Sequence, residues 1–127
     1  MSSKLYKPLD GLFLVAYCGL IFWLSDQERL SMPQVFHFED KLLHFAAYFV
    51  MGGLSWRAFR HLKLKGFFLA FVSLVFCSLF GLSDEWHQSF VPGRDASSLD
   101  WLADTLGSAV AVTAALIIDR RFRLQTA

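Results

Sequence analysis

Residues 66–94 read GFFLAFVSLVFCSLFGLSDEWHQSFVPGR, and they set the environment in which the rest of the chain must fold. The first 18 of these residues, Gly66–Ser83, carry no charge, and a run of that length and composition is typical of a membrane-spanning helix. The next five, Asp84–Gln88, include two carboxylates, a histidine and an amide. The uncharged run is too long for a helix of a soluble core, and a helix that only anchors a protein in the membrane does not need the polar residues that follow. The stretch therefore predicts a spanning helix that ends in a group of polar side chains.

The rest of the chain is similarly apolar. Hydrophobic residues make up 55% of the 127 residues and charged residues 18%, whereas soluble domains average about 45–50% and about 25%. Three further runs, Gly11–Ser25, Leu42–Trp56 and Thr105–Ile118, are almost free of charge and reach the roughly 20 residues of a span when polar flanks are included. We predict an all-α polytopic membrane protein, a transmembrane four-helix bundle that forms one domain over residues 1–127. Its helices are expected near residues 9–26, 40–60, 66–90 and 99–119.

Lys and Arg are unevenly distributed along the chain. Nine of the twelve lie at the N-terminus, after the second predicted helix or at the C-terminus: Lys4, Lys7, Arg57, Arg60, Lys63, Lys65, Arg120, Arg121 and Arg123. Nine of the eleven Asp and Glu residues lie at the opposite ends of the helices. Short loops rich in Lys and Arg stay in the cytoplasm, so both termini are expected to be cytoplasmic. The net charge of +1 conceals this polarity and predicts no nucleic-acid binding.

Polar side chains recur at helical spacing near the outer ends of three predicted helices. Within each helix they lie three or four residues apart and share a face: Asp40, His44 and Tyr48; Gly81, Asp84 and Gln88; Asp100, Asp104 and Ser108. An ionisable side chain costs roughly 2.5–3.5 kcal/mol in the bilayer core and almost always faces the protein interior or a wet cavity. The three faces are therefore expected to form one pocket open to the outside, where His44, Glu85 and Asp100 approach one another and Lys41 and Arg94 lie over the mouth.

Three of these segments resemble a known family. DKLLHFAAY at residues 40–48, DEWHQSFVPGR at 84–94 and DWLADTLG at 100–107 are similar to the VanZ-like family of small bacterial membrane proteins, over roughly residues 40–111. Asp104 stands where many members have Asn, and Ala111 where a second Gly is common. The family is named for an accessory determinant of resistance to the glycopeptide teicoplanin. The resemblance therefore implies a cell-envelope role at the outer face of the bacterial inner membrane, with antibiotic resistance as its context.

The residues leave several mechanisms open, and the first is an enzyme acting on an anionic envelope lipid or lipid-linked precursor. Asp84 and Glu85 would supply a buried carboxylate for general acid–base catalysis, and His44 would be the second proton carrier. Lys41 and Arg94 would bind the anion, Arg94 through the two-pronged geometry that suits phosphate or carboxylate. Five further residues are assigned to substrate binding: Gln88, Tyr48, Asp40, Asp100 and Asp104.

Three alternatives use the same residues without that chemistry. The pocket could bind a lipid head group, a cell-wall precursor or a lipoglycopeptide without turnover. It could belong to a small transporter or proton relay, although polar residues confined to the outer half give no complete path. It could also be structural, with Asp–Lys and Glu–Arg pairs joining the helix ends. Nine carboxylates against three cations at that end argue against complete pairing. The sequence does not indicate an oligomeric state.

A metal is the last open question. The candidate ligands for zinc or a harder divalent cation are His44, Asp84, Glu85, His87, Asp100 and Asp104. Because the sequence has no HExxH motif, no metal ligand and no cofactor is assigned, while a divalent ion that relieves the excess of acid remains an alternative. Cys18 and Cys77 are expected to be apolar fillers, and His37 and His61 to be solvated in loops.

Overall fold

The computed structural model describes residues 3–28 and 39–125, and within them it contains α-helices, one short 3₁₀ helix and no strand. In chain order the elements are α1 (Ser3–Asp26), α2 (Glu39–Phe59), η1 (Arg60–Leu62), α3 (Gly66–Gln88) and α4 (Ser98–Gln125). The prediction of an all-α fold is confirmed for these residues. Arg29 and His37, which lie between the first and second helices in the sequence, are outside the described residues.

Two helices are longer than the sequence predicts. α1 begins at Ser3 instead of near residue 9, and α4 continues to Gln125 instead of ending near residue 119. Apolar runs mark the part of a helix suited to lipid, whereas charged residues with good helix propensity continue the same helix into water. In α4 this extension includes an ion pair one turn apart, in which Arg123 Nε lies 2.9 Å from Asp119 Oδ2.

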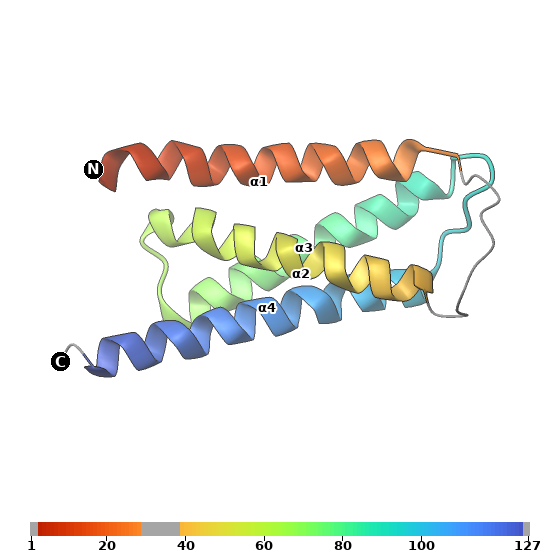
Figure 1. Ribbon diagram of the computed structural model, residues 1–127. Helices are drawn as coiled ribbons and strands as arrows, with labels where there is room; N and C mark the ends of the chain where they lie inside the picture. Colours follow the sequence, from red (N-terminus) through yellow and green to blue (C-terminus); the bar gives the residue numbers. More distant parts are fainter. Residues whose placement is uncertain (1–2, 29–38, 126–127) are drawn as a thin grey trace.

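The four α-helices run along a common long direction (Figure 1). Both chain ends lie at the end of the molecule that carries the α2–α3 connection, and the α3–α4 connection lies at the other end (Figure 1). At the α2–α3 connection the backbone reverses through two residues in the left-handed region, Lys63 at φ 63° and Gly66 at φ 56°. α4 then begins after Ser97, whose Oγ accepts a hydrogen bond of 3.2 Å from the Leu99 N–H.

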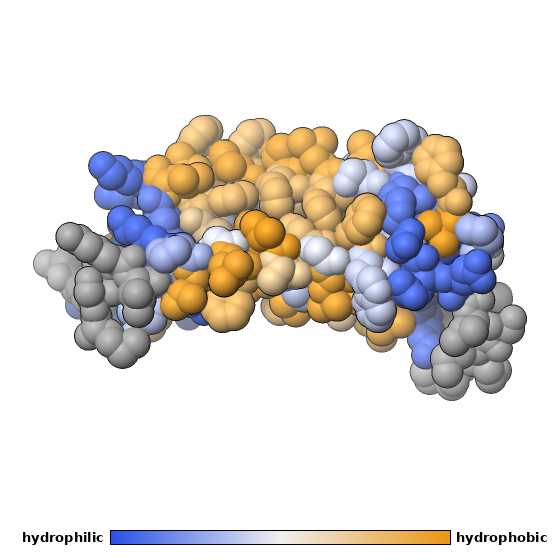
Figure 2. Space-filling view, turned by 90° about the horizontal axis from the view of Figure 1, so that it is seen from above, coloured by the Kyte–Doolittle hydropathy of each residue, from blue (hydrophilic) through white to orange (hydrophobic). Residues whose placement is uncertain are grey.

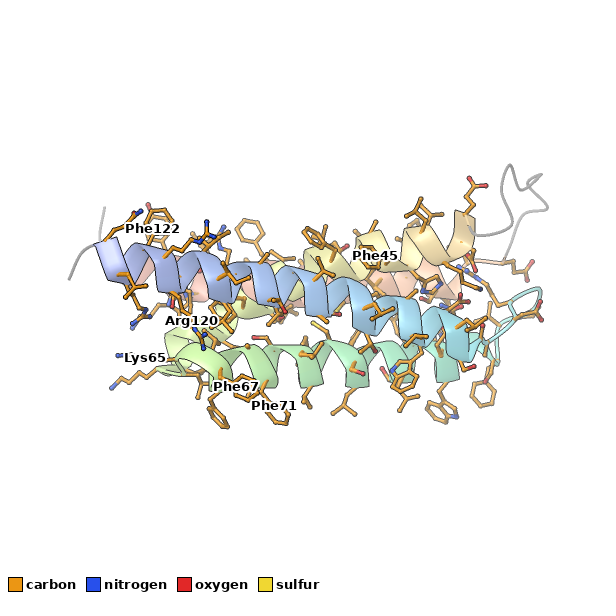
Figure 3. All side chains as sticks on the ribbon, turned by 90° about the horizontal axis from the view of Figure 1, so that it is seen from below. Phe45, Lys65, Phe67, Phe71, Arg120 and Phe122 are labelled. Carbon is orange, nitrogen blue, oxygen red and sulfur yellow. The ribbon has the colours of Figure 1, made fainter. Side chains whose placement is uncertain are left out.

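α2 and α4 pack with their backbones close together because small residues line the contact. A Cβ atom added to Gly107 would overlap the carbonyl oxygen of Phe45, and one added to Gly52 would lie 3.0 Å from the Ala111 Cβ. Figure 3 shows Phe45 on α2 beside α4. Small residues recur at steps of four on α4, at Ala103, Gly107, Ala111 and Ala115, and the contacts of Gly107 and Ala111 show that this face packs within the chain, as membrane-embedded helices prefer.

The molecule has an apolar middle and polar ends. In Figure 2 hydrophobic residues cover the central part of the visible face, and hydrophilic residues gather toward both ends. Phe67 and Phe71 point away from the other helices (Figure 3). Within the described residues, three helices are long and apolar enough to cross a membrane: α1 from Tyr6, α3 and α4. A fourth span over α2, which begins Glu39-Asp40-Lys41, stays a prediction.

Candidate functional site

His44 is the centre of a polar cluster at the end of the molecule that carries the α3–α4 connection. Its Nδ1 lies 2.8 Å from Asp104 Oδ1 and 3.9 Å from Glu85 Oε1. Its Nε2 lies 4.0 Å from Asp100 Oδ2. α2 thus supplies the imidazole, the last turn of α3 one carboxylate, and the first two turns of α4 two more. The predicted approach of His44, Glu85 and Asp100 across three helices is confirmed.

Lys41 and Asp40 lie one turn before His44 on α2. The Lys41 ammonium forms an ion pair with Asp100, and its Nζ lies 3.7 Å from Asp40 Oδ2. Asp100 is buried, so this pair brings a positive charge into the cluster from its rim. The sequence assigns Lys41 to an incoming anion and Asp40 and Asp100 to substrate binding. Those roles stay predictions, and the structure adds that Lys41 balances Asp100.

Asp84, Gln88 and Tyr48 form the part of the pocket that faces α1. Gln88 Nε2 donates hydrogen bonds to Asp84 Oδ2 at 3.2 Å and to Ser25 Oγ at 3.3 Å. Tyr48 is fully buried, and its hydroxyl has no hydrogen-bond partner among the described residues. The neighbours Asp84 and Glu85 therefore have different surroundings, since Asp84 bonds to an amide and Glu85 faces the imidazole. Ser25 ends an apolar run, and the residues one helical turn before it, Ile21 and Phe22, are apolar, so sequence reasoning missed it.

Arg94 makes contacts with the end of α1 that the sequence does not predict, and its role in binding an anion stays a prediction. Its Nε donates a hydrogen bond of 3.0 Å to the Gln27 carbonyl, and its Nη2 donates one of 2.6 Å to the Leu24 carbonyl. The guanidinium therefore caps the C-terminal end of α1 and links it to the α3–α4 connection. Carbonyl groups at a helix end lack partners within the helix and attract cations. Arg94 still lines the pocket, beside Ser25 and Asp84.

Two hollows flank the cluster. The first, of about 190 Å³, has a polar lining that includes Asp40, His44, Tyr48, Asp84, Gln88 and Arg94, and it lacks Glu85, Asp100 and Asp104 of the predicted pocket. It is smaller than the roughly 300–1,000 Å³ of sites that enclose a drug-sized ligand. The second, of about 570 Å³, is a mostly apolar groove between α3 and the start of α4, flanked by Trp86 and Trp101. Glu85 lines this groove and also faces His44.

The other described histidines lie outside the pocket. His87 stacks on Phe22, with ring centroids 4.4 Å apart, and its Nε2 lies 3.2 Å from Asp26 Oδ1. His61 was expected to be solvated, but this expectation is wrong. Its Nε2 lies 2.7 Å from Oδ2 of the buried Asp10, whose Oδ1 lies 2.8 Å from Arg57 Nη2. Sequence spacing gives no sign of this second cluster because its members come from separate elements.

Two groups of three side chains in the described part of the chain have the spacing of metal ligands. One is Asp40, His44 and Asp100, and the other is His44, Glu85 and Asp104. In each group the potential ligand atoms lie within 4.8 Å of one another. Asp84 and His87, which the sequence also offers as ligands, belong to neither. Cys18 and Cys77 are not bonded to each other, as expected for apolar fillers.

The sequence matches the VanZ/LLP1 family over residues 11–119, a range that covers most of the chain. The chain belongs to the VanZ/LLP1 family. The match extends beyond the resemblance over residues 40–111 because it includes most of α1, which supplies Ser25 to the pocket. No curated protein and no solved structure matches the chain. As a VanZ/LLP1 protein with three helices suited to crossing a bilayer, it is a membrane protein.

The arrangement of His44 and the carboxylates around it determines the chemistry that this polar cluster can perform. An imidazole between carboxylates within 4.0 Å can accept or release a proton, as general acid–base catalysis requires. The same carboxylates can bind a cation. Both abilities depend on His44, Glu85 and Asp104, and the apolar groove at Glu85 lies between α3 and the start of α4.

Proposed function

We propose that this VanZ/LLP1 protein is a multi-pass protein of the bacterial inner membrane, with four spanning helices and both termini in the cytoplasm. The distribution of Lys and Arg supports the orientation, and the shared end of the two termini supports an even number of spans (Figure 1). Among the four described α-helices, α2 alone lacks a window apolar enough for a span, and it carries Asp40, His44 and Tyr48 of the pocket. Packing against α4 shields this face from lipid.

In this orientation the pocket opens to the extracytoplasmic face, where it acts on an anionic envelope lipid or lipid-linked precursor. The head group enters the cavity lined by His44 and Asp84, and an apolar chain lies in the groove beside Trp86 and Trp101. His44 and Glu85 carry the proton that the reaction moves. The protection against teicoplanin for which the family is named follows from a changed envelope lipid or precursor.

One observation carries this proposal: Glu85 lines the apolar groove and faces His44, which lines the polar cavity. Its Oε1 faces His44 Nδ1 at 3.9 Å, and its side chain also lines the tryptophan-flanked groove. Its other oxygen, Oε2, accepts a hydrogen bond of 2.9 Å from the Ser97 N–H, which holds the carboxylate in this position. A proton carrier between a polar cavity and an apolar groove suits a substrate that is itself polar at one end and apolar at the other.

Binding without turnover is the second candidate. It is favoured by the volume of the apolar groove, about 570 Å³, which is enough for a large part of an acyl chain or a lipoglycopeptide tail. In this case Glu85 would position the ligand by accepting hydrogen bonds, and its ionisation would matter little.

Teicoplanin susceptibility of a sensitive host tests the proposal. Expression of the wild-type protein should raise the minimal inhibitory concentration, and Glu85→Gln should return it to the value for the empty vector. General acid–base catalysis contributes about a hundred- to ten-thousand-fold in rate, so its loss should abolish the phenotype. Asp95→Asn is the matched control, because Asp95 is an exposed carboxylate in the connection between α3 and α4.

The outcomes separate the candidates. Resistance that survives Glu85→Gln supports binding without turnover, since the amide keeps the shape and most hydrogen bonds. A wild-type protein that leaves susceptibility unchanged, at expression verified in the membrane fraction, contradicts the envelope role in both forms.

A further inference from the structure

Two buried carboxylate oxygens beside His44 have no hydrogen-bond partner among the described residues. They are Glu85 Oε1 and Asp104 Oδ2, on side chains that belong to residues 6% and 0% exposed. More than nine in ten buried polar atoms in native proteins have a partner, so each exception calls for an explanation. Glu85 Oε1 faces the imidazole. A carboxylate oxygen without a donor is suited to bind a proton or a cation.

The charges around the pocket are out of balance in the same direction. Five carboxylates lie at or next to it: Asp40, Asp84, Glu85, Asp100 and Asp104. Among the described residues, the cations there are Lys41, which pairs with Asp100 and Asp40, and Arg94, which donates to carbonyl groups at the end of α1. Within this part of the chain neither forms an ion pair with Glu85 or Asp104.

Lys41 also separates the two groups that have ligand spacing. In the group of Asp40, His44 and Asp100, the Lys41 ammonium already contacts both carboxylates. Within the described residues, the ion pairs of His44, Glu85 and Asp104 include no Lys or Arg. A divalent cation would therefore balance the negative charge of Glu85 and Asp104 in the second group, whereas in the first group it would compete with Lys41.

The distances in this second group suit a single small cation. Two ligands of a tetrahedral zinc ion, with bonds of about 2.0–2.1 Å, lie about 3.3–3.4 Å apart. His44 Nδ1 lies 2.8 Å from Asp104 Oδ1 and 3.9 Å from Glu85 Oε1, so the two separations bracket that value. The third separation, between Glu85 and Asp104, lies within 4.8 Å, so the side chains must close further around a bound ion. His44 Nε2 lies 4.0 Å from Asp100 Oδ2, on the side where a carboxylate orients many metal-binding histidines.

We propose that His44 through Nδ1, Glu85 and Asp104 bind one divalent transition-metal ion. Imidazole with two carboxylates suits Zn²⁺ among the abundant divalent ions. Three protein ligands leave a fourth position open toward the pocket. There the ion supplies the positive charge that an anionic head group needs, a step that rests on the proposed function, whereas the metal site itself does not.

Metal binding by the purified full-length protein tests this inference without lipid or drug. Detergent-solubilised protein is stripped with EDTA, reloaded with ZnSO₄ and freed of excess metal, and its zinc content is measured by mass spectrometry. The wild-type protein should retain one ion per chain. Glu85→Gln and Asp104→Asn should each weaken binding by more than the roughly 10- to 100-fold that loss of an outer partner costs.

Asp40→Asn is the discriminating control, since Asp40 belongs only to the group that Lys41 fills. This variant should keep the ion; loss of zinc in Asp40→Asn but not in Glu85→Gln would overturn the assignment. A second measurement needs no variant. Co²⁺ in the same site should give the intense visible absorption of a four-coordinate ion, and Zn²⁺ should displace it. Wild-type protein that holds no more metal than Glu85→Gln, and shows only the spectrum of aqueous Co²⁺, refutes the site. A negative teicoplanin result would leave these measurements unaffected.

Discussion

At the scale of single residues, the buried carboxylates perform different tasks at the two ends of the molecule. The Asp10 carboxylate, near the chain termini, pairs with Arg57 of α2 and His61 of η1. Its oxygens lie 2.8 Å from Arg57 Nη2 and 2.7 Å from His61 Nε2. Its oxygens are therefore satisfied within the protein. Glu85 and Asp104, at the opposite end, each keep one oxygen without a partner. Full pairing, as at Asp10, is typical of a structural contact. Buried oxygens without a partner among the described residues, as at Glu85 and Asp104, call for an explanation such as a bound ion or water.

Asp10→Ala should consequently loosen α1 without altering the outer pocket. The change removes the acceptor of the mostly buried His61, and an unsatisfied buried polar group costs about 1–3 kcal/mol. Arg57 is exposed and can bond to water instead. A lower melting temperature of the detergent-solubilised protein would register it. Asp119→Ala is the control, because the pair with Arg123 is an exposed pair one turn apart, worth about 0.3–0.5 kcal/mol. Equal melting temperatures for the two variants would contradict the assigned role of Asp10.

The sequence could predict the residues of the outer pocket but not all of their partners. His44 and the carboxylates of α4 were predictable because a steps-of-four pattern of ionisable groups in an apolar helix must face inward. The partners of Arg94 were not, since they are backbone carbonyls, which every residue possesses. Asp10 and His61 escaped for a related reason: their contact depends on how α1 is rotated against α2, and no spacing within one helix sets that angle.

At the scale of elements, the contact between α2 and α4 holds the site together. It brings His44 Nδ1 of α2 to 2.8 Å from Asp104 Oδ1 of α4. The contact depends on Gly107, where the two backbones approach closely. Small residues at every fourth position of α4 favour a close helix contact, but this spacing does not determine whether the partner is another helix of the chain or another subunit. The structure assigns it to α2 through Gly107 at Phe45 and Ala111 at Gly52.

Gly107→Ala should therefore separate α2 from α4 and disturb the His44–Asp104 hydrogen bond. The added Cβ would overlap the Phe45 carbonyl oxygen, which is backbone and cannot turn aside. Overpacking of this kind costs about 1–3 kcal/mol, occasionally more. Gly53→Ala on α2 is the matched control, because a Cβ there meets nothing within 4 Å and alanine favours a helix. Thermal unfolding of both variants in detergent should show a loss for Gly107→Ala alone; an unchanged melting temperature would show that the helices can separate at no cost.

At the scale of the whole molecule, the two polar ends are chemically distinct. The end with both termini carries the excess of Lys and Arg, and the other end carries most of the carboxylates and the pocket. Figure 2 shows the apolar zone between them. Because basic loops stay in the cytoplasm, this asymmetry determines which side of the membrane the pocket can serve.

Cysteine labelling in intact cells tests that orientation. Asp95 is exposed in the connection between α3 and α4, and Arg121 is exposed near the end of α4. Asp95→Cys should react with a membrane-impermeant thiol reagent in intact cells, whereas Arg121→Cys should react only after lysis. The background should be low because Cys77 is buried and Cys18 is half-buried within α1, and the unmodified protein measures it. The reverse pattern would turn the pocket toward the cytoplasm, where an enzyme of the outer envelope could not reach its substrate, and the proposed function would fail while the metal site could still exist.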